Sequence, residues 1–160
     1  MPVKSRLPCA AAWCLVALLA APFLAGCAAL SSDCTDFFGL DEAQRKEKFK
    51  TYPIEKQLAL YRCAMQREPP NGELAYYIAE GGQGHIPLLL ERLKSASEPD
   101  KADIIYVFKA MSILGKLDCR QDVVDQVEQA AAGLRVKVYR DNALGDVAEM
   151  KKGYTCKTAK

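Results

Sequence analysis

The chain has 160 residues with 22 basic and 20 acidic side chains, a formal charge of +2, and hydrophobic residues at half of its positions. A chain of this length forms one domain that buries roughly two thirds of its unfolded surface, and two large domains are excluded. The nearly balanced charge speaks against electrostatic binding of nucleic acid, which requires a clustered basic face. Composition therefore predicts one globular domain without a nucleic-acid partner.

The N-terminus has the pattern of an export signal. Lys4 and Arg6 form a short positive region, and residues 7–25 carry no charge. Such an apolar segment leaves water readily and enters a membrane. It ends at Leu24-Ala25-Gly26-Cys27, where small residues precede a thiol. We expect residues 1–26 to be removed, which takes away two of the 22 basic groups and leaves 134 residues with 20 charges of each sign.

This segment resembles the bacterial lipoprotein signal peptide, whose lipobox is Leu-Ala-Gly-Cys. The match covers Met1 to Cys27, and all four lipobox positions agree, namely Leu24, Ala25, Gly26 and Cys27. The resemblance implies that Cys27 becomes the first mature residue and carries a diacylglyceryl anchor. Each buried methylene contributes about 0.8 kcal/mol, so two or three acyl chains hold a protein firmly. Because Ala28 and Ala29 follow the cysteine, the resemblance also implies the periplasmic face of the outer membrane.

Two alternatives to lipidation remain for this segment, an uncleaved transmembrane helix and ordinary secretory cleavage. Roughly 18 apolar residues can span a bilayer, although Pro8 and Pro22 disfavour that helix. The predicted organisation is a cleaved signal at 1–26, a lipidated N-terminus and tether at 27–40, a helical domain at 41–156 and a C-terminal tail at 157–160.

The seven cysteines divide by role. Cys9 and Cys14 leave with the signal and Cys27 takes the lipid, so four remain: Cys34, Cys63, Cys119 and Cys156. An even number in an exported chain favours disulfides, with free buried thiols as the alternative. A metal site is disfavoured because the chain has no Cys-x-x-Cys pair and a single histidine.

Helical geometry favours one of the three possible pairings. In the predicted helix over residues 53–68, Cys63 points away from the apolar stripe, so the segment that holds Cys34 is the natural cover for it. Cys119 and Cys156 each follow the end of a predicted helix. We therefore predict the bonds Cys34–Cys63 and Cys119–Cys156, each of which stabilises by about 3–4 kcal/mol in the chain-entropy model.

Apolar residues recur at helical spacing, and no stretch shows sustained period-two alternation. The pattern predicts an all-α domain of six or seven helices, two of them opened by the capping-box pairs Asp41–Gln44 and Asp118–Gln121, with a polar break at 95–100. The predicted core-facing stripes are Ile54, Leu58, Tyr61 and Met65; Leu74, Tyr77 and Ile78; Ile86, Leu89, Leu90 and Leu93; Ile104, Val107, Phe108, Met111 and Leu114; Val123, Val124, Val127, Ala131 and Leu134; and Tyr139, Ala143, Val147 and Met150.

The helices also repeat. Helices near residues 86 and 104 are echoed near 123 and 142, an offset of roughly 37 residues. Residues 85–93 resemble the first helix of a HEAT-type repeat, and residues 137–150 are similar to a second repeat helix. The mature chain also resembles a family of uncharacterised helical proteins, which implies no function. The predicted fold is thus irregular HEAT-like helix pairs or a small helical bundle, stapled by disulfides.

No motif predicts chemistry. Residues 81–84 form a glycine cluster without the Lys-Ser/Thr of a phosphate loop, which favours a helix-ending turn. His85 could act as a general base, but the sequence identifies no partner for it. Ser112 lacks the surrounding glycines of a nucleophile elbow. Tyr76, Tyr77 and Tyr106 fit a core rim or a recognition patch. We expect no catalytic residue, cofactor or metal.

The sequence therefore favours a lipid-anchored helical binding or scaffold module of the cell envelope, with an unidentified protein or peptide partner. One alternative is an envelope enzyme whose site is assembled around His85 and a carboxylate of shifted pKa. Another is a pilotin-like assembly chaperone, an analogy that rests on size, anchor and helicity.

Overall fold

The computed structural model describes residues 34–67, 69–117 and 120–153. Throughout these ranges the regular elements are helices, which confirms the predicted all-α class. The chain forms two compact units, one that ends at Leu40 and one that begins at Asp41. The predicted signal peptide and lipobox, and the predicted Cys119–Cys156 bond, lie outside the described residues.

The described part of the first unit is short. Residues 34–38 are helical, and the buried Phe37 ring meets Phe38 edge-on with ring centroids 5.1 Å apart. The predicted disulfide between Cys34 and Cys63 is present. Cys34 belongs to the predicted tether at 27–40, and Cys63 belongs to the predicted helical domain at 41–156.

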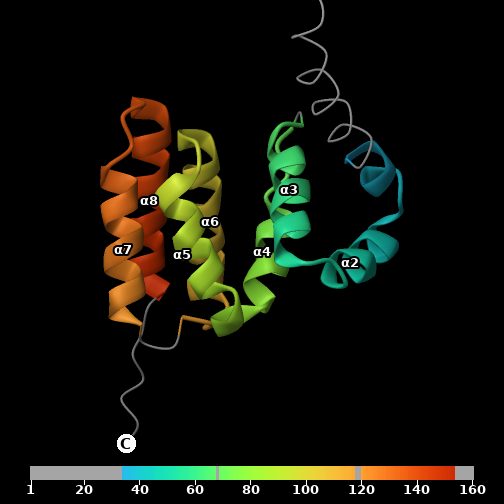
Figure 1. Ribbon diagram of the computed structural model, residues 1–160, viewed down its shortest axis with the longest axis horizontal. Coiled ribbons are helices and arrows are strands. Elements are labelled where there is room, and N and C mark those ends of the chain that lie inside the picture. The colour runs from blue at the N-terminus through green and yellow to red at the C-terminus, as the bar shows by residue number, and fades with distance from the viewer. Residues whose placement is uncertain (1–33, 68, 118–119, 154–160) are drawn as a thin grey trace, which may run out of the picture. The chain divides into compact units, whose positions relative to one another are not determined.

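The second unit consists of consecutive helices joined by short turns (Figure 1). Their bounds are α2 (Glu42–Lys50), α3 (Ile54–Met65), α4 (Glu73–Glu80), the 3-10 turn η1 (Gly82–Gly84), α5 (Ile86–Ser95), α6 (Glu98–Ile113), α7 (Gln121–Ala132) and α8 (Lys137–Gly153). The polar break predicted at 95–100 is shorter than expected, because Ser97 caps α6 and the helix begins at Glu98.

Three helix ends can be compared with the capping residues in the sequence, and two of them have the expected capping geometry. Asp41 opens α2 by accepting the backbone N–H of Gln44 at 2.8 Å, as predicted. The end of α6 is a Schellman turn, in which the N–H of Lys116 donates to the Met111 carbonyl at 2.8 Å and Gly115 has a φ of 66°. The predicted second capping box is wrong. Helix α7 begins at Gln121, so this residue opens the helix and does not occupy its third position.

The last four helices form two hairpins, α5–α6 and α7–α8, stacked so that α5 lies beside α7 and α6 beside α8 (Figure 1). Side-chain bonds keep α6 and α8 parallel at a nearly constant offset. Lys109 bonds to Asp146, 37 residues later, and Ser112 bonds to the Met150 carbonyl, 38 residues later. The predicted spacing of about 37 residues therefore recurs in the packing of a small helical bundle, while membership of the HEAT class stays a prediction.

The hydrophobic core is centred on α6. This helix is covered on more than one side, and its buried apolar residues are Ile104, Ile105, Val107, Phe108, Ala110 and Met111. Its predicted core residue Leu114 is instead 40% exposed, since it lies beyond the last helical residue at the start of the Gly115 turn. Leu117 and Phe49, which no predicted stripe included, are buried.

The core face of α3 differs from the predicted stripe. Leu58 and Met65 are only half-buried, and the buried face contains Gln57, Leu60, Tyr61 and Ala64. A polar side chain is accommodated there because Gln57 Nε2 donates to the carbonyls of Phe49 and Tyr52, at 3.2 and 3.0 Å. These bonds attach α3 to the end of α2, and the side of α3 that carries Gln57 is therefore the buried side.

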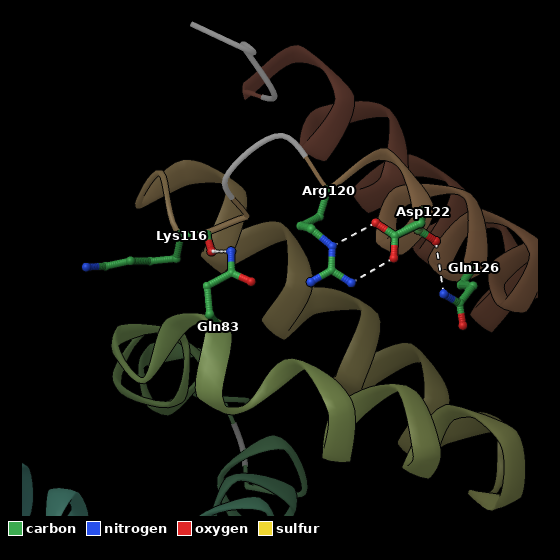
Figure 2. Close-up of polar contacts among 5 residues, drawn as sticks. All are labelled: Gln83, Lys116, Arg120, Asp122 and Gln126. Atoms are coloured by element: carbon green, nitrogen blue, oxygen red, sulfur yellow. Dashed lines mark hydrogen bonds and ion pairs between the residues drawn. The ribbon is translucent and has the colours of Figure 1, made fainter. Parts of the chain in front are cut away.

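The glycine cluster at residues 81–84 is a structural turn, and Figure 2 shows its polar contact with the loop after α6. Gly82 has a φ of 56°, a conformation that favours glycine. Gln83 Nε2 donates to the carbonyl of Lys116 at 3.1 Å. In the same view, the Arg120 guanidinium donates two hydrogen bonds, of 2.8 and 2.7 Å, to the Asp122 carboxylate at the start of α7.

Candidate functional site

A groove of about 860 Å³ is bordered by the C-terminal part of α3, by α6 and by α8. We call it the α6–α8 groove. Its ionisable lining is mainly acidic. The carboxylates are Asp100, Asp103, Asp141, Asp146 and Glu149, and the cations are Arg62 and Lys109. Because α6 and α8 run parallel, residues of both helices meet at the same level along the groove.

Lys109 is fixed at the centre of this groove. Its Nζ lies 2.9 Å from Asp146 Oδ1 and 5.1 Å from the centre of the Tyr106 ring. The hydrogen bond to Asp146 raises the pKa of Lys109, so the ammonium stays charged. Both partners are about one fifth exposed, so solvent screens the pair only partly.

The three tyrosines that the sequence grouped are divided between two places. Tyr106 lines the groove, and the Tyr76 ring meets it edge-on with centroids 6.4 Å apart. The Tyr77 ring packs against the Phe49 ring of α2, with ring centroids 6.1 Å apart, and the Tyr77 hydroxyl donates a hydrogen bond to Glu73. All three tyrosines are half-buried, which fits the predicted core rim, and of the three only Tyr106 lines the groove.

A smaller cavity of about 200 Å³ lies between α3, the end of α5 and the start of α6. We call it the Asp103 pocket. It shares Arg62, Asp100 and Asp103 with the α6–α8 groove. Its remaining wall includes the apolar side chains of Leu58, Ala59, Ala96 and Ile104, together with Tyr61.

Asp103 lies in a partly buried position next to another acid. Burial, reinforced by the neighbouring Asp100, raises its pKa from 3.8 to about 6. Arg62 opposes this shift by a smaller amount, and its guanidinium is bonded to Asp100 at 2.6 Å. Among the described residues, Asp103 itself forms no ion pair.

Tyr61 lies beneath the same place. The residue is 1% exposed, and its hydroxyl has no hydrogen-bond partner among the described residues. Burial, reinforced by the nearby Asp103, Tyr106 and Asp146, raises the pKa of Tyr61, and the residue lines the Asp103 pocket. The sequence predicted Tyr61 as a core residue, and its periodicity contained no sign of an unsatisfied polar group.

His85 has a structural environment. Its Nδ1–H donates to the carbonyl of Ile78 at 2.9 Å, and the residue lines neither of the two cavities. Ser112, the other candidate considered from the sequence, is buried and donates its hydroxyl to the Met150 carbonyl at 2.8 Å. The enzyme alternative required His85 beside a carboxylate of shifted pKa. The carboxylate whose pKa is raised is Asp103, and it lies in the Asp103 pocket, which His85 does not line.

Within the described ranges, no group of three or more His, Cys, Asp and Glu side chains is placed to hold a metal ion. None of the described helices is both long and apolar enough to cross a bilayer. Comparison of the chain with protein families, with curated proteins and with solved structures finds no match.

The first prediction concerns Gly81 and His85. A Cβ at Gly81 would lie 2.0 Å from the His85 ring, whereas one at Gly84 meets nothing within 4 Å. Gly81→Ala should displace the ring from Ile78 and lower the free energy of unfolding by about 1–2 kcal/mol. Gly84→Ala should change it by less than about 0.5 kcal/mol. Urea unfolding of both variants measures the difference, and equal values would contradict a structural role for His85.

The second prediction concerns Asp103 and pH. Its pKa is about 6 in the folded state against an ordinary 3.8, so folding loses stability as the pH rises through this interval. Asp103→Asn should increase the free energy of unfolding by about 1–2 kcal/mol at pH 7.5, a value discounted for partial exposure. The gain should vanish near pH 4.

Thermal or urea unfolding across this pH range provides the measurement. Asp125→Asn is the matched control, since Asp125 is exposed on α7 and accepts only from Gln121. A stability difference for Asp103→Asn that stays constant from pH 4 to pH 7.5 would show that its carboxylate does not carry the burial cost.

Proposed function

We propose that the protein is a lipid-anchored, non-catalytic binding module of the cell envelope, whose α6–α8 groove binds an extended segment of a partner protein. The observation that carries the proposal is the groove itself, an acidic channel that borders three helices. The proposal places the protein on the periplasmic face of the outer membrane, held there through Cys27.

The length of the groove fits a peptide. Its lining along α8 extends from Tyr139 to Glu149. At 1.5 Å per helical residue this span is about 15 Å long. An extended chain advances about 3.3 Å per residue, so roughly four or five partner residues would lie along it. Polar side chains spaced along such a surface fix the register of a bound segment.

The groove is also supported rigidly. Its two long walls, α6 and α8, are joined by the Lys109–Asp146 ion pair and by the buried Ser112–Met150 bond. A preorganised surface loses little conformational entropy when a partner binds. A binding role therefore uses the helix pairing directly, whereas the enzyme alternative depends on His85, whose Nδ1 is engaged by the backbone.

The third prediction tests occupancy of the groove in cells. A photo-crosslinking amino acid at Asn142, which lines the groove, should give one discrete adduct in intact envelopes. The same amino acid at Glu91, an exposed position on α5 outside both cavities, should not give it. Mass spectrometry should place the adduct on one segment of one protein. Identical patterns at both positions, or none at Asn142, would contradict the proposal.

The fourth prediction tests the anchor. Radiolabelled palmitate should be incorporated into the wild-type protein but not into Cys27→Ser, because the thiol of Cys27 is the predicted attachment site. Cys14→Ser is the matched control, since this cysteine belongs to the predicted signal, and its label should equal that of the wild type. Label that persists in Cys27→Ser, or membrane association that is unchanged, would remove the lipid anchor from the proposal.

A further inference from the structure

We infer that the Asp103 pocket receives the cationic side chain of an arginine or lysine of the bound segment. This inference rests on the proposed peptide-binding role of the groove and names the chemistry of its partner. It is carried by three features of the pocket, as far as the structure describes the chain: the composition of its walls, an acid that forms no ion pair, and a buried hydroxyl without a hydrogen-bond partner.

The walls suit a long basic side chain. Leu58, Ala59 and Ile104 supply apolar surface for the aliphatic stem, while Asp100 and Asp103 supply carboxylates for the charged head. Arginine and lysine bury their methylenes in this way and keep the cation in a polar environment. The volume of about 200 Å³ limits the occupant to a single side chain, and the residues shared with the α6–α8 groove place it beside the peptide backbone.

Among the described residues the partly buried Asp103 forms no ion pair, although Arg62 and Arg92 also line the pocket. The nearby guanidinium of Arg62 is bonded to Asp100 at 2.6 Å and is half-exposed. A partly buried carboxylate without a counter-ion is costly, and a cationic ligand would offset that cost. The same ligand would lower the pKa of Asp103, because an adjacent positive charge favours the ionised form.

Tyr61 provides the second, independent sign of a ligand. Its hydroxyl is buried and has no hydrogen-bond partner among the described residues, and Tyr61 is one of the residues that line the Asp103 pocket. Buried polar atoms are normally hydrogen-bonded. The phenolic oxygen can accept an N–H from a guanidinium or an ammonium group. A basic side chain would therefore satisfy Asp103 and Tyr61 together.

The charge of the surroundings favours the same ligand. Five carboxylates and two cations line the α6–α8 groove, so its local field attracts basic segments. The Asp103 pocket itself is lined by the acids Glu55, Asp100 and Asp103 and by the cations Arg62 and Arg92, so an acidic side chain there would meet more like charges than opposite ones. Binding should accordingly weaken with rising salt, and it should weaken as the pH falls through 6 and Asp103 takes up its proton.

The fifth prediction uses peptides that differ in one charge. Full-length processed protein in detergent micelles, labelled with ¹³C at the Asp carboxyl carbons, is titrated with Ac-Gly-Gly-Arg-Gly-Gly-NH₂ and with its lysine analogue. The control peptide carries citrulline, which keeps the shape of arginine without the charge. The arginine peptide should bind at least about tenfold more tightly than the citrulline peptide and should lower the pKa of Asp103.

Variants separate the pocket from the rest of the groove. Asp103→Asn should weaken binding of the arginine peptide by at least about tenfold, while Asp125→Asn should leave it unchanged. Equal binding of the arginine and citrulline peptides, or an unchanged pKa of Asp103, would overturn the inference. If the Asn142 adduct in envelopes persists in Asp103→Asn at its wild-type level, the groove keeps its peptide-binding role and the pocket assignment fails. If that adduct never forms, the proposed function fails independently of the peptide titration.

Discussion

The packing of α6 against α8 is the interaction on which the rest of the domain depends. Helix α6 is buried on more than one side, so it cannot keep its structure without neighbours. Its bonds to α8 fix both direction and register, through Lys109 with Asp146 and Ser112 with the Met150 carbonyl. That register determines which side chains of the two helices lie at one level and form the walls of the groove.

Two groups between α3 and α6 are poorly satisfied. Tyr61 is buried, and its hydroxyl has no hydrogen-bond partner among the described residues, while Asp103 is held in a partly desolvated position beside another acid. Both lower stability, because a buried polar group without a partner loses its hydration and gains no bond in return. Polar groups of this kind concentrate at functional sites, where a local cost is retained for the sake of a ligand. Tyr61 and Asp103 both line the Asp103 pocket, so the loss of stability is confined to one place in the domain.

The sequence predicted the helices well where the apolar pattern is complete. All five residues of the α7 stripe are buried: Val123, Val124, Val127, Ala131 and Leu134. It failed for α3, because the buried Gln57 is satisfied by carbonyls of the preceding turn, which periodicity does not encode. The groove could not be predicted in the same way. Lys109 and Asp146 are 37 residues apart, and each resembles an ordinary surface residue of its own helix.

The stacking of the hairpins also explains why the repeat is regular in space and weak in sequence. At an offset of 37 residues, equivalent positions of successive hairpins become neighbours, so identical charges there would repel. The observed neighbours are complementary. Lys109 faces Asp146, and Glu98 accepts from Arg135. Two backbone N–H groups further favour this arrangement, since the N–H groups of Val136 and Arg135 also bind the Glu98 carboxylate and lower its pKa. At these charged positions, stacking of the two hairpins therefore favours residues of opposite charge over identical residues, which weakens the periodicity of the sequence.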